Sequence, residues 1–417
     1  MRTSFLPLVA VLATTAVVLS AENYHVHEWG TMTQVAGSDG APLKWHQPSS
    51  DLSGLPGFVG LNLFQAKNLG SALVRMETPV LYFYPQSPLK GTASVTMENG
   101  RITEWYPFPA SPPTSLTAKV GEPVNLSAPV EWRFELLPPD DKTALGQIPP
   151  APRGRGDHYA HAREVPDAWI VRSTHPTGST QADKFIFYRG AADLNIPLLV
   201  TAPSDTELRL INTYSEPITR AFLLRVENNR ASWRKLETLP VAPKDSPTLA
   251  IEPPATSVNE AATSLAEAVK QELTSAGLTP AEAAAMVATW KEAWFKEPGT
   301  RVLALLPESW VNAVLPLKLS PTPTKVKRVF VARMEVFPPS QEKAVAALLD
   351  QAVTERATPA LAAAFQKLQM GRFGSAGLER AAAMKRLALQ TAFYELQASA
   401  QKLQASADDT PPSASSR

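Results

Sequence analysis

The chain has 417 residues, of which 40 are Lys or Arg and 39 are Asp or Glu, so its formal net charge is +1. This balance gives no electrostatic reason to expect a nucleic acid as partner. The chain contains no cysteine, which excludes disulfides, catalytic thiolates, Fe–S clusters and cysteine-based zinc sites.

The first 21 residues are typical of a secretory signal peptide. Arg2 precedes an apolar run over residues 5–19, and the small residues Ser20 and Ala21 offer a cleavage site. The run is shorter than the roughly 20 residues that span a bilayer, and no later segment of the sequence is long and apolar enough to do so. We therefore expect an exported protein, periplasmic or extracellular, with no transmembrane segment after signal cleavage.

Residues 22–250 have the pattern of a β-rich region. The strongest strand signal is the segment 74–84, in which Pro79 predicts an edge strand or a bulge. The strands are short and separated by proline and asparagine, which predicts antiparallel sheets packed as a β-sandwich-like region. The other strands predicted here are 92–98, 101–106, 130–137, 169–172, 184–189, 198–201, 207–214, 220–227 and 230–236.

Two short turns predict how some of these strands connect. Asn99-Gly100 is a preferred pair for a two-residue hairpin loop, so the strands on its two sides are expected to pair. Asn228-Asn229 predicts a second tight turn between the last two strands of the region.

Residues 251–336 predict a helical hairpin and further strands that pack on the β region. Ser257 begins a capping box, Pro280 occupies the first position of the second helix, and Trp290 and Trp294 share its apolar face. The fold class is therefore mainly β with helical additions (α+β). The remaining predictions are strands at 301–306 and 325–336, Ala-rich long helices over 337–405 and a disordered tail over 406–417.

Seven strings of residues resemble an uncharacterised family of exported bacterial proteins that carry an N-terminal His-Glu-Trp-Gly-Thr motif. The resemblance implies export and a shared fold, and it implies no particular reaction. The usual aromatic residue after Gly30-Thr31 is Met32 here, a departure that affects packing more than chemistry. The strings are His27-Glu-Trp-Gly-Thr31, Glu77-Thr-Pro-Val-Leu-Tyr-Phe-Tyr84, Glu104-Trp-Tyr-Pro107, Lys184-Phe-Ile-Phe-Tyr-Arg-Gly190, Trp290-Lys-Glu-Ala-Trp-Phe295, Arg301-Val-Leu-Ala-Leu-Leu-Pro307 and Leu315-Pro-Leu-Lys-Leu-Ser-Pro321.

The first candidate site is a histidine pair, His25 and His27, at the start of the mature protein. Residues two apart on a strand project side by side, so the two imidazoles can share a divalent metal such as zinc. His158 and His161 are the natural further ligands, with His46 next. Glu28 would point to the opposite face of the strand. The alternative interpretation is a pair of ordinary strand histidines that are exposed or hydrogen-bonded.

The second candidate is the long segment between residues 138 and 166, where Arg153 and Arg155 alternate with glycines. Guanidinium groups in such a loop can receive a carboxylate or phosphate, and the alternative is a solvated loop without a specific role. Trp29 is a third candidate ligand-binding residue, because an exposed indole can stack on a sugar, although large aromatics pack in cores more often.

The sequence leaves three functions open. It contains neither the Gly-x-Ser-x-Gly motif nor a phosphate-binding glycine loop. The leading reading is a binding or structural role outside the cytoplasm with an unknown extracytoplasmic ligand. The alternatives are a metal-dependent hydrolase centred on His25 and His27, and a carbohydrate-binding protein. Glu77, Glu104 and Glu131 are strand carboxylates available for glycoside cleavage, with nothing to prefer them over ordinary roles.

Overall fold

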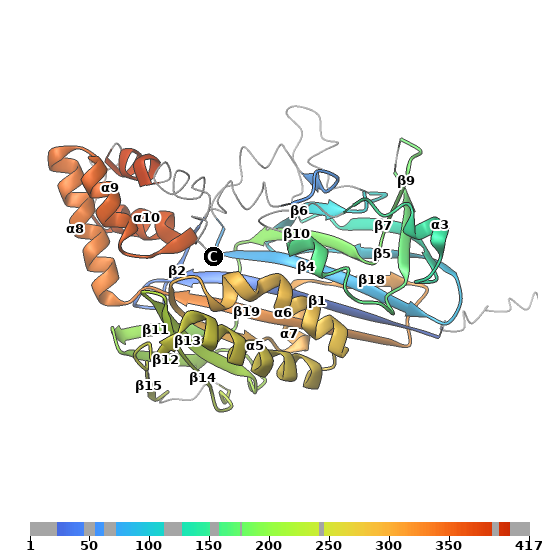
Figure 1. Ribbon diagram of the computed structural model, residues 1–417, viewed down its shortest axis with the longest axis horizontal. Coiled ribbons are helices and arrows are strands. Elements are labelled where there is room, and N and C mark those ends of the chain that lie inside the picture. Colours follow the sequence, from blue (N-terminus) through green and yellow to red (C-terminus); the bar gives the residue numbers. More distant parts are fainter. Residues whose placement is uncertain are drawn as a thin grey trace, which may run out of the picture.

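The structure of the protein is a computed structural model (Figure 1). The structure describes residues 23–45, 55–61, 72–111, 127–150, 158–175, 177–241, 246–385 and 392–400. The predicted signal peptide and the predicted C-terminal tail lie outside these ranges. No helix in the described part of the chain is both long enough and apolar enough to cross a membrane.

A large mixed sheet forms the centre of the molecule, and in the described ranges it has 11 strands. Strand β1 (Tyr24–Ala36) lies near its middle and pairs in parallel with β19 (Lys325–Val336) and antiparallel with β4 (Val74–Pro85). The order is β16-β14-β13-β17-β19-β1-β4-β10-β6-β3, with β2 (Pro42–Leu43) paired to β1. The other members are β3 (Gly60–Leu61), β6 (Gly100–Tyr106), β10 (Ile186–Ala192), β13 (Ala221–Glu227), β14 (Arg230–Lys235), β16 (Thr256–Ser257) and β17 (Gly299–Leu305).

Two smaller antiparallel sheets cover one face of the large sheet. Their apolar side chains and those of the large sheet form one buried core, to which Val26, Trp132 and Leu208 belong. This packing of sheet on sheet is the predicted sandwich-like part of the fold. One small sheet has the order β18-β5-β7-β8-β9 and the other β11-β12-β15. The strands are β5 (Leu89–Val95), β7 (Val130–Leu137), β8 (Ile170–Thr174), β9 (Thr180–Asp183), β11 (Leu198–Ser204), β12 (Glu207–Asn212), β15 (Thr248–Ala250) and β18 (Leu317–Ser320).

The predicted helical hairpin covers the opposite face of the large sheet (Figure 1). Helix α5 (Val258–Ser275) begins at a capping box on Ser257, and α6 (Pro280–Phe295) begins at a second one on Thr279. Trp290 and Trp294 are almost fully buried in the core between α6 and the sheet, as predicted. The short helix α4 (His158–His161) packs beside α6, while α3 (Lys142–Leu145) and α7 (Glu308–Val314) lie in loops.

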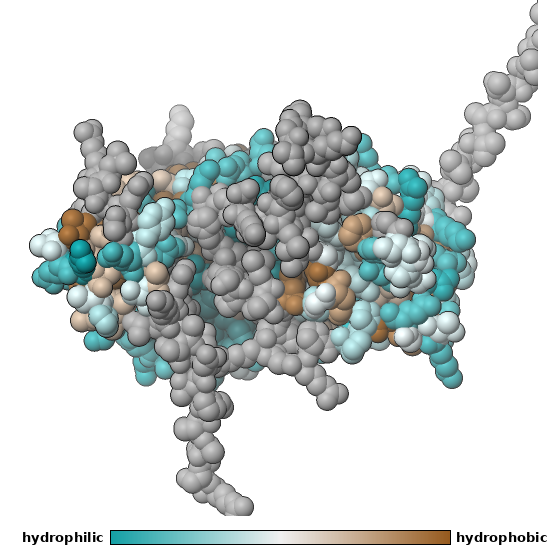
Figure 2. All heavy atoms as spheres, turned by 90° about the horizontal axis from the view of Figure 1, so that it is seen from above, coloured by the Kyte–Doolittle hydropathy of each residue, from teal (hydrophilic) through white to brown (hydrophobic). Residues whose placement is uncertain are grey.

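A separate helical layer lies at one end of the large sheet (Figure 1). It consists of α8 (Pro339–Glu355), α9 (Pro359–Gln366), the 3-10 turn η2 (Gly371–Phe373) and α10 (Gly374–Lys385). These helices share an apolar core with Val35, Trp45 and Phe337. On the face seen in Figure 2 the visible described residues are mainly hydrophilic, and apolar side chains show only in small separate groups.

The fold class is confirmed as mainly β with helical additions, and two connections differ from the prediction. The turn at Asn99 forms, with φ of 50° and a hydrogen bond from the Gly100 amide to the Met97 carbonyl. The predicted hairpin is wrong, because β5 pairs with β7 and β18 whereas β6 pairs with β10 and β3. The turn passes the chain from one sheet to another. The large sheet also crosses the predicted boundary at residue 250. Strands β17 and β19, which follow this boundary in the sequence, lie between β13 and β1, which precede it.

Candidate functional site

The N-terminal motif lies on β1, in the middle of the large sheet. His25 is exposed, whereas His27 is mostly buried and its Nδ1 lies 2.9 Å from Oε2 of Glu282. The hydroxyl of Tyr84 donates to the same carboxylate at 2.6 Å. Glu282 is also part of the capping box of α6. His27 therefore connects β1 to the start of the helix that covers it.

The four predicted metal-ligand histidines are not assembled into a site by the residues the structure describes. Helix α4 does lie against α6, on the sheet face where His27 lies. His161 has Glu164 as its neighbour, with Nδ1 3.4 Å from the carboxylate. The side chain of His158, together with residues 46, 153 and 155, lies outside the described parts. Within those parts no three His, Asp or Glu side chains are close enough to share a metal ion, so the metal site stays a prediction.

Trp29, the third predicted ligand residue, is fully buried in the core beneath the helical hairpin. Its ring centroid lies 6.3 Å from that of Tyr82. An indole in this position packs against its neighbours and offers no face to a sugar at the surface. Trp45, Trp105 and Trp132 are equally buried.

Glu28 points to the opposite face of β1, as strand alternation predicts, and forms a buried ion pair there. Nε of Arg328, on the neighbouring strand β19, lies 2.5 Å from Oε2 of Glu28. The hydroxyl of Tyr188 donates to the other oxygen. Arg328 further donates to the carbonyl of Leu315 at 2.6 Å and to Asn312 at 3.0 Å. The motif thereby fixes the end of β19 in relation to α7.

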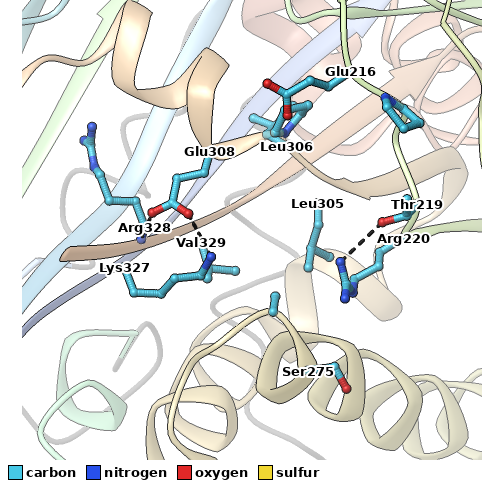
Figure 3. Close-up of a pocket in the computed structure, with 13 residues that line it drawn as sticks. Glu216, Thr219, Arg220, Ser275, Leu305, Leu306, Glu308, Lys327, Arg328 and Val329 are labelled. Atoms are coloured by element: carbon cyan, nitrogen blue, oxygen red, sulfur yellow. Dashed lines mark hydrogen bonds and ion pairs between the residues drawn. The ribbon is translucent and has the colours of Figure 1, made fainter. Parts of the chain in front are cut away.

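A polar cleft opens beside this ion pair, with a volume of about 310 Å³ (Figure 3). Its walls come from the end of β17, the first residues of β19, the loop before β13, the end of α5 and the start of α7. The side chain of Arg328 runs away from the cleft toward the interior, while its backbone amide donates to Glu308 at 2.9 Å. Lys327 lies beside it, with Nζ 2.8 Å from the other oxygen of Glu308.

Charges of both signs line this cleft, and Arg220, Glu308 and Lys327 each have at least one partner within the protein. Arg220, on the wall opposite Lys327, pairs with Glu272 at 3.1 Å. Glu216 accepts a hydrogen bond from the hydroxyl of Ser309. The side chains of Arg220 and Lys327 are about one third and one quarter exposed, 34% and 25% respectively. Each therefore keeps donor groups that a ligand can reach.

A second polar feature, here called the charged strip, crosses the helix-covered face of the large sheet between the end of α6 and η2. Residues next to these charged residues along their strands belong to the core on the other face of the sheet; Met76, Trp105 and Met334 are examples. Because side chains alternate along a strand, the charged side chains lie on the helix-covered face. All the strand members of the strip are at most 4% exposed. The charged strip consists of Arg75, Glu77, Glu104, Arg189, Arg301, Arg333 and Glu335 from the strands, with Glu297 and Arg372.

Ion pairs connect much of the charged strip into one network. Arg372 lies 2.8 Å from Glu77 and 3.0 Å from Glu297, and Arg333 lies 2.7 Å from Glu297. Glu335 joins Arg333 at 3.0 Å and Arg301 at 3.1 Å. Because Arg372 belongs to η2, this network attaches the C-terminal helical layer to the sheet.

The arginines hold two carboxyl groups of the strip in the charged form. Burial acts to raise the pKa of Glu77, but the charge of Arg372 and a hydrogen bond from Thr33 outweigh it, and the pKa is lowered. Burial likewise opposes ionisation of Glu297, and Arg333 and Arg372 overcome it so that its pKa is about 2. The pKa of Arg301 is lowered to about 10 by burial. At these two carboxyl groups, the favourable effect of the nearby arginines is therefore larger than the opposing effect of burial.

The backbone is irregular where the strip crosses β4 and its neighbours. One residue is added in β4 at Thr78-Pro79, the bulge that Pro79 predicted, and another in β6 at Thr103. Thr78 has a φ of 50°, which is uncommon for a β-branched residue and marks local strain. Bulges of this kind redirect side chains and are frequent beside functional sites.

The sequence named two members of the strip, Glu77 and Glu104, as available carboxylates, and missed the arginines. A signal was present, because Glu77, Glu104, Arg189 and Arg301 each lie in one of the strings that resemble the exported family. The structure brings the first three of these strings together on the neighbouring strands β4, β10 and β6, whereas Arg301 lies on β17, beyond β1 and β19. Glu131, the third carboxylate, lies apart from them on β7.

Comparison with known proteins gives distant matches in solved structures alone. No family model matches the chain, and no curated protein matches it. The Mu homology domain of Fcho1 from Danio rerio with a bound Eps15 peptide is 11% identical, with a TM-score of 0.31. The yeast delta-COP-I mu-homology domain complexed with a Dsl1 peptide is 7% identical, with a TM-score of 0.29. Each match covers 77% of this chain and 100% of the other, and we draw nothing on function from similarity at this level.

Proposed function

We propose that the protein is an exported binding protein, working in the periplasm or outside the cell, that holds a segment of polypeptide in the polar cleft. Export is supported by the signal-like first 21 residues and by the resemblance to an exported family. The absence of cysteine means that core packing and buried ion pairs, and no disulfide, stabilise the protein there.

The observation that carries the proposal is the pair of charged walls that face each other across the cleft. Lys327 with Glu308 forms one wall, and Arg220 stands on the other. An ammonium group has three donors and a carboxylate has several acceptor sites, so one internal ion pair does not exhaust either group. A peptide backbone offers carbonyl and amide groups in alternation and matches walls that present donors and acceptors together.

The buried motif supports this surface from behind. Glu28 fixes Arg328, and the adjacent Lys327 and the Arg328 amide both contact Glu308. Groups that are held in place before binding lose less conformational entropy when a ligand arrives. The N-terminal motif is thereby assigned a positioning role for the cleft.

A displayed library of random dodecapeptides, selected on the mature protein, tests the proposal. Selected peptides should bind the wild-type protein and lose at least tenfold in affinity for Lys327→Met and Glu308→Gln, since a charge-assisted hydrogen bond contributes about 1.5–3 kcal/mol. Lys318→Met and Glu98→Gln, at exposed positions outside the cleft, serve as matched controls. Peptides that bind the cleft variants and the wild-type protein equally would leave the structural role as the remaining reading.

A further inference from the structure

Arg189 in the charged strip is a buried cation with unused hydrogen-bonding groups. Arg189 is 4% exposed, and among the residues that the structure describes neither its Nε nor its Nη1 has a hydrogen-bond partner. Its guanidinium carbon lies 5.7 Å from the ring centre of Phe187. Buried polar groups in folded proteins are almost always hydrogen-bonded, because an unpaired one loses its hydration without replacement. An unpaired donor of this kind is available to a partner from outside the chain.

The carboxylates near Arg189 have other hydrogen-bond partners, although the charge of Arg189 also helps to lower the pKa of Glu77. Glu104, its cross-strand neighbour on β6, accepts a hydrogen bond from Thr103. Glu77, on the other neighbouring strand, binds Thr33 at 2.6 Å and Arg372 at 2.8 Å. The charged strip as defined above contains five arginines and four glutamates, so it has an excess of positive charge. An anion would both balance this charge and satisfy Arg189.

The backbone next to Arg189 is shaped in a way that ordinary sheet pairing does not need. The bulges in β4 and β6 lie on its two sides, and the strained Thr78 is in the part of β4 opposite residues 188 and 189. Thr78 is 3% exposed, and its hydroxyl also lacks a hydrogen-bond partner within the described part of the chain. Two orphan groups therefore lie on adjacent strands at the same level of the sheet.

We propose that the charged strip binds a small oxyanion, the carboxylate or phosphate group of a ligand, through Arg189. Arginine is suited to oxyanions because its guanidinium is always charged and presents several N–H donors in a plane. The hydroxyl of Thr78 supplies a further donor from the neighbouring strand. Solvent reaches the strip at Glu297, whose side chain is 29% exposed. This site is separate from the cleft and uses none of its residues.

Thermal unfolding of the mature protein in sodium phosphate, sodium acetate and sodium chloride, at equal ionic strength and pH, tests the proposal. A ligand that binds the folded state raises the melting temperature in proportion to the logarithm of its concentration above Kd. We expect such a rise in phosphate or in acetate relative to chloride. A rise with phosphate alone that Arg189→Met abolishes identifies a phosphate group as the ligand chemistry, since phosphate also stabilises proteins without binding. A rise with acetate alone that Arg189→Met abolishes identifies a carboxylate. Equal melting temperatures in all three salts would overturn the proposal.

Variants assign the effect to Arg189. Arg189→Met should abolish the salt-specific rise, whereas Arg133→Met, which removes an exposed arginine from β7, should keep it. Arg189→Lys keeps the charge with a different donor geometry and should weaken binding about tenfold, so it serves if the Met variant does not fold. An unchanged rise in Arg189→Met, or unchanged affinity in Arg189→Lys, would contradict the assignment. The cleft variant Lys327→Met should keep the rise, so failure of one proposed site does not imply failure of the other.

Discussion

Glu28 and Arg328 form an ion pair across 300 residues of sequence, and both residues are at most 2% exposed. The pair connects the first strand of the sheet to the last one. Its two strands run parallel, and Glu28 is the register partner of Arg328. Tyr188, Asn312 and the Leu315 carbonyl satisfy much of the remaining hydrogen-bonding capacity of the two groups. A buried pair of this kind is tolerated because its partners are fixed on rigid elements.

Removing one partner of this pair should be much more harmful than removing both. Glu28→Gln and Arg328→Met each leave a buried group without its partner, at a cost of about 3–5 kcal/mol. The double variant should cost clearly less than either single variant, and therefore less than their sum. Urea unfolding of the four proteins gives the coupling free energy. Additive single effects would show that the pair makes no specific contribution.

An exposed pair provides the matched control for this measurement. Arg133 and Glu131 lie 3.2 Å apart on β7, with the arginine 72% exposed. Solvent screens such a pair, so breaking it should change the free energy of unfolding by about 0–1 kcal/mol. A loss as large as that of the buried pair would show that charge removal itself destabilises the fold.

Local signals in the sequence predicted individual elements well. The capping box at Ser257 and the helix start at Pro280 form as expected, and Asn228-Asn229 makes the tight turn between β13 and β14. Each of these features depends on residues within a few positions of one another, so the sequence contains all the information that the feature needs.

Pairing between distant strands was not predictable in the same way. The turn at Asn99 was identified, but which sheet receives the strand after it depends on the packing of β6 against β10. The parallel pairing of β1 with β19 depends on a crossover through most of the chain. The alternation of side chains along β1 placed Glu28 on the correct face, because it depends on one strand alone. Its partner Arg328 lies on β19 and was not identified, because this depends on the pairing of distant strands. The members of the charged strip are spread through the sequence from Arg75 to Arg372, so their spacing in the sequence could not predict that they lie together.

The stacked pair Trp290 and Trp294 should be essential to the attachment of α6. Their ring centroids lie 6.2 Å apart, and they are 2% and 0% exposed. Replacing either with Ala should lower the free energy of unfolding by about 3–5 kcal/mol, because the change leaves a large cavity in the core. Glu292→Ala, at an exposed position on the same helix, should cost less than about 1 kcal/mol. Unchanged melting of the tryptophan variants would contradict the packing role.

Cleavage of the signal peptide should leave a mature chain that begins at residue 21 or 22. The short apolar run and the small residues Ser20 and Ala21 predict cleavage after one of these two positions. Intact-mass spectrometry of the protein recovered from the expressing bacterium measures the new N-terminus. A chain that keeps Met1 and fractionates with the membrane would contradict export by this route.

The charged strip should make the stability of the protein sensitive to acid. The pKa of Glu297 is about 2, compared with an ordinary value of 4.5, and the pKa of Glu77 is also lowered. The folded state therefore binds protons at these carboxyls less readily than the unfolded state does. Their contribution to stability is complete above the unfolded pKa and is lost as the pH falls through the folded pKa.

The expected result is a free energy of unfolding that decreases as the pH falls from about 5 to about 2. In Glu297→Gln the decrease should be less steep, because the variant has no carboxylate at this position to take up a proton on unfolding. Stability near pH 7 should be lower, because Arg333 and Arg372 lose an ionised partner. Glu98→Gln, at an exposed position outside the strip, should keep the wild-type slope. Urea unfolding at a series of pH values measures the three slopes, and equal slopes for Glu297→Gln and the wild-type protein would show that Glu297 is not held ionised by its arginines.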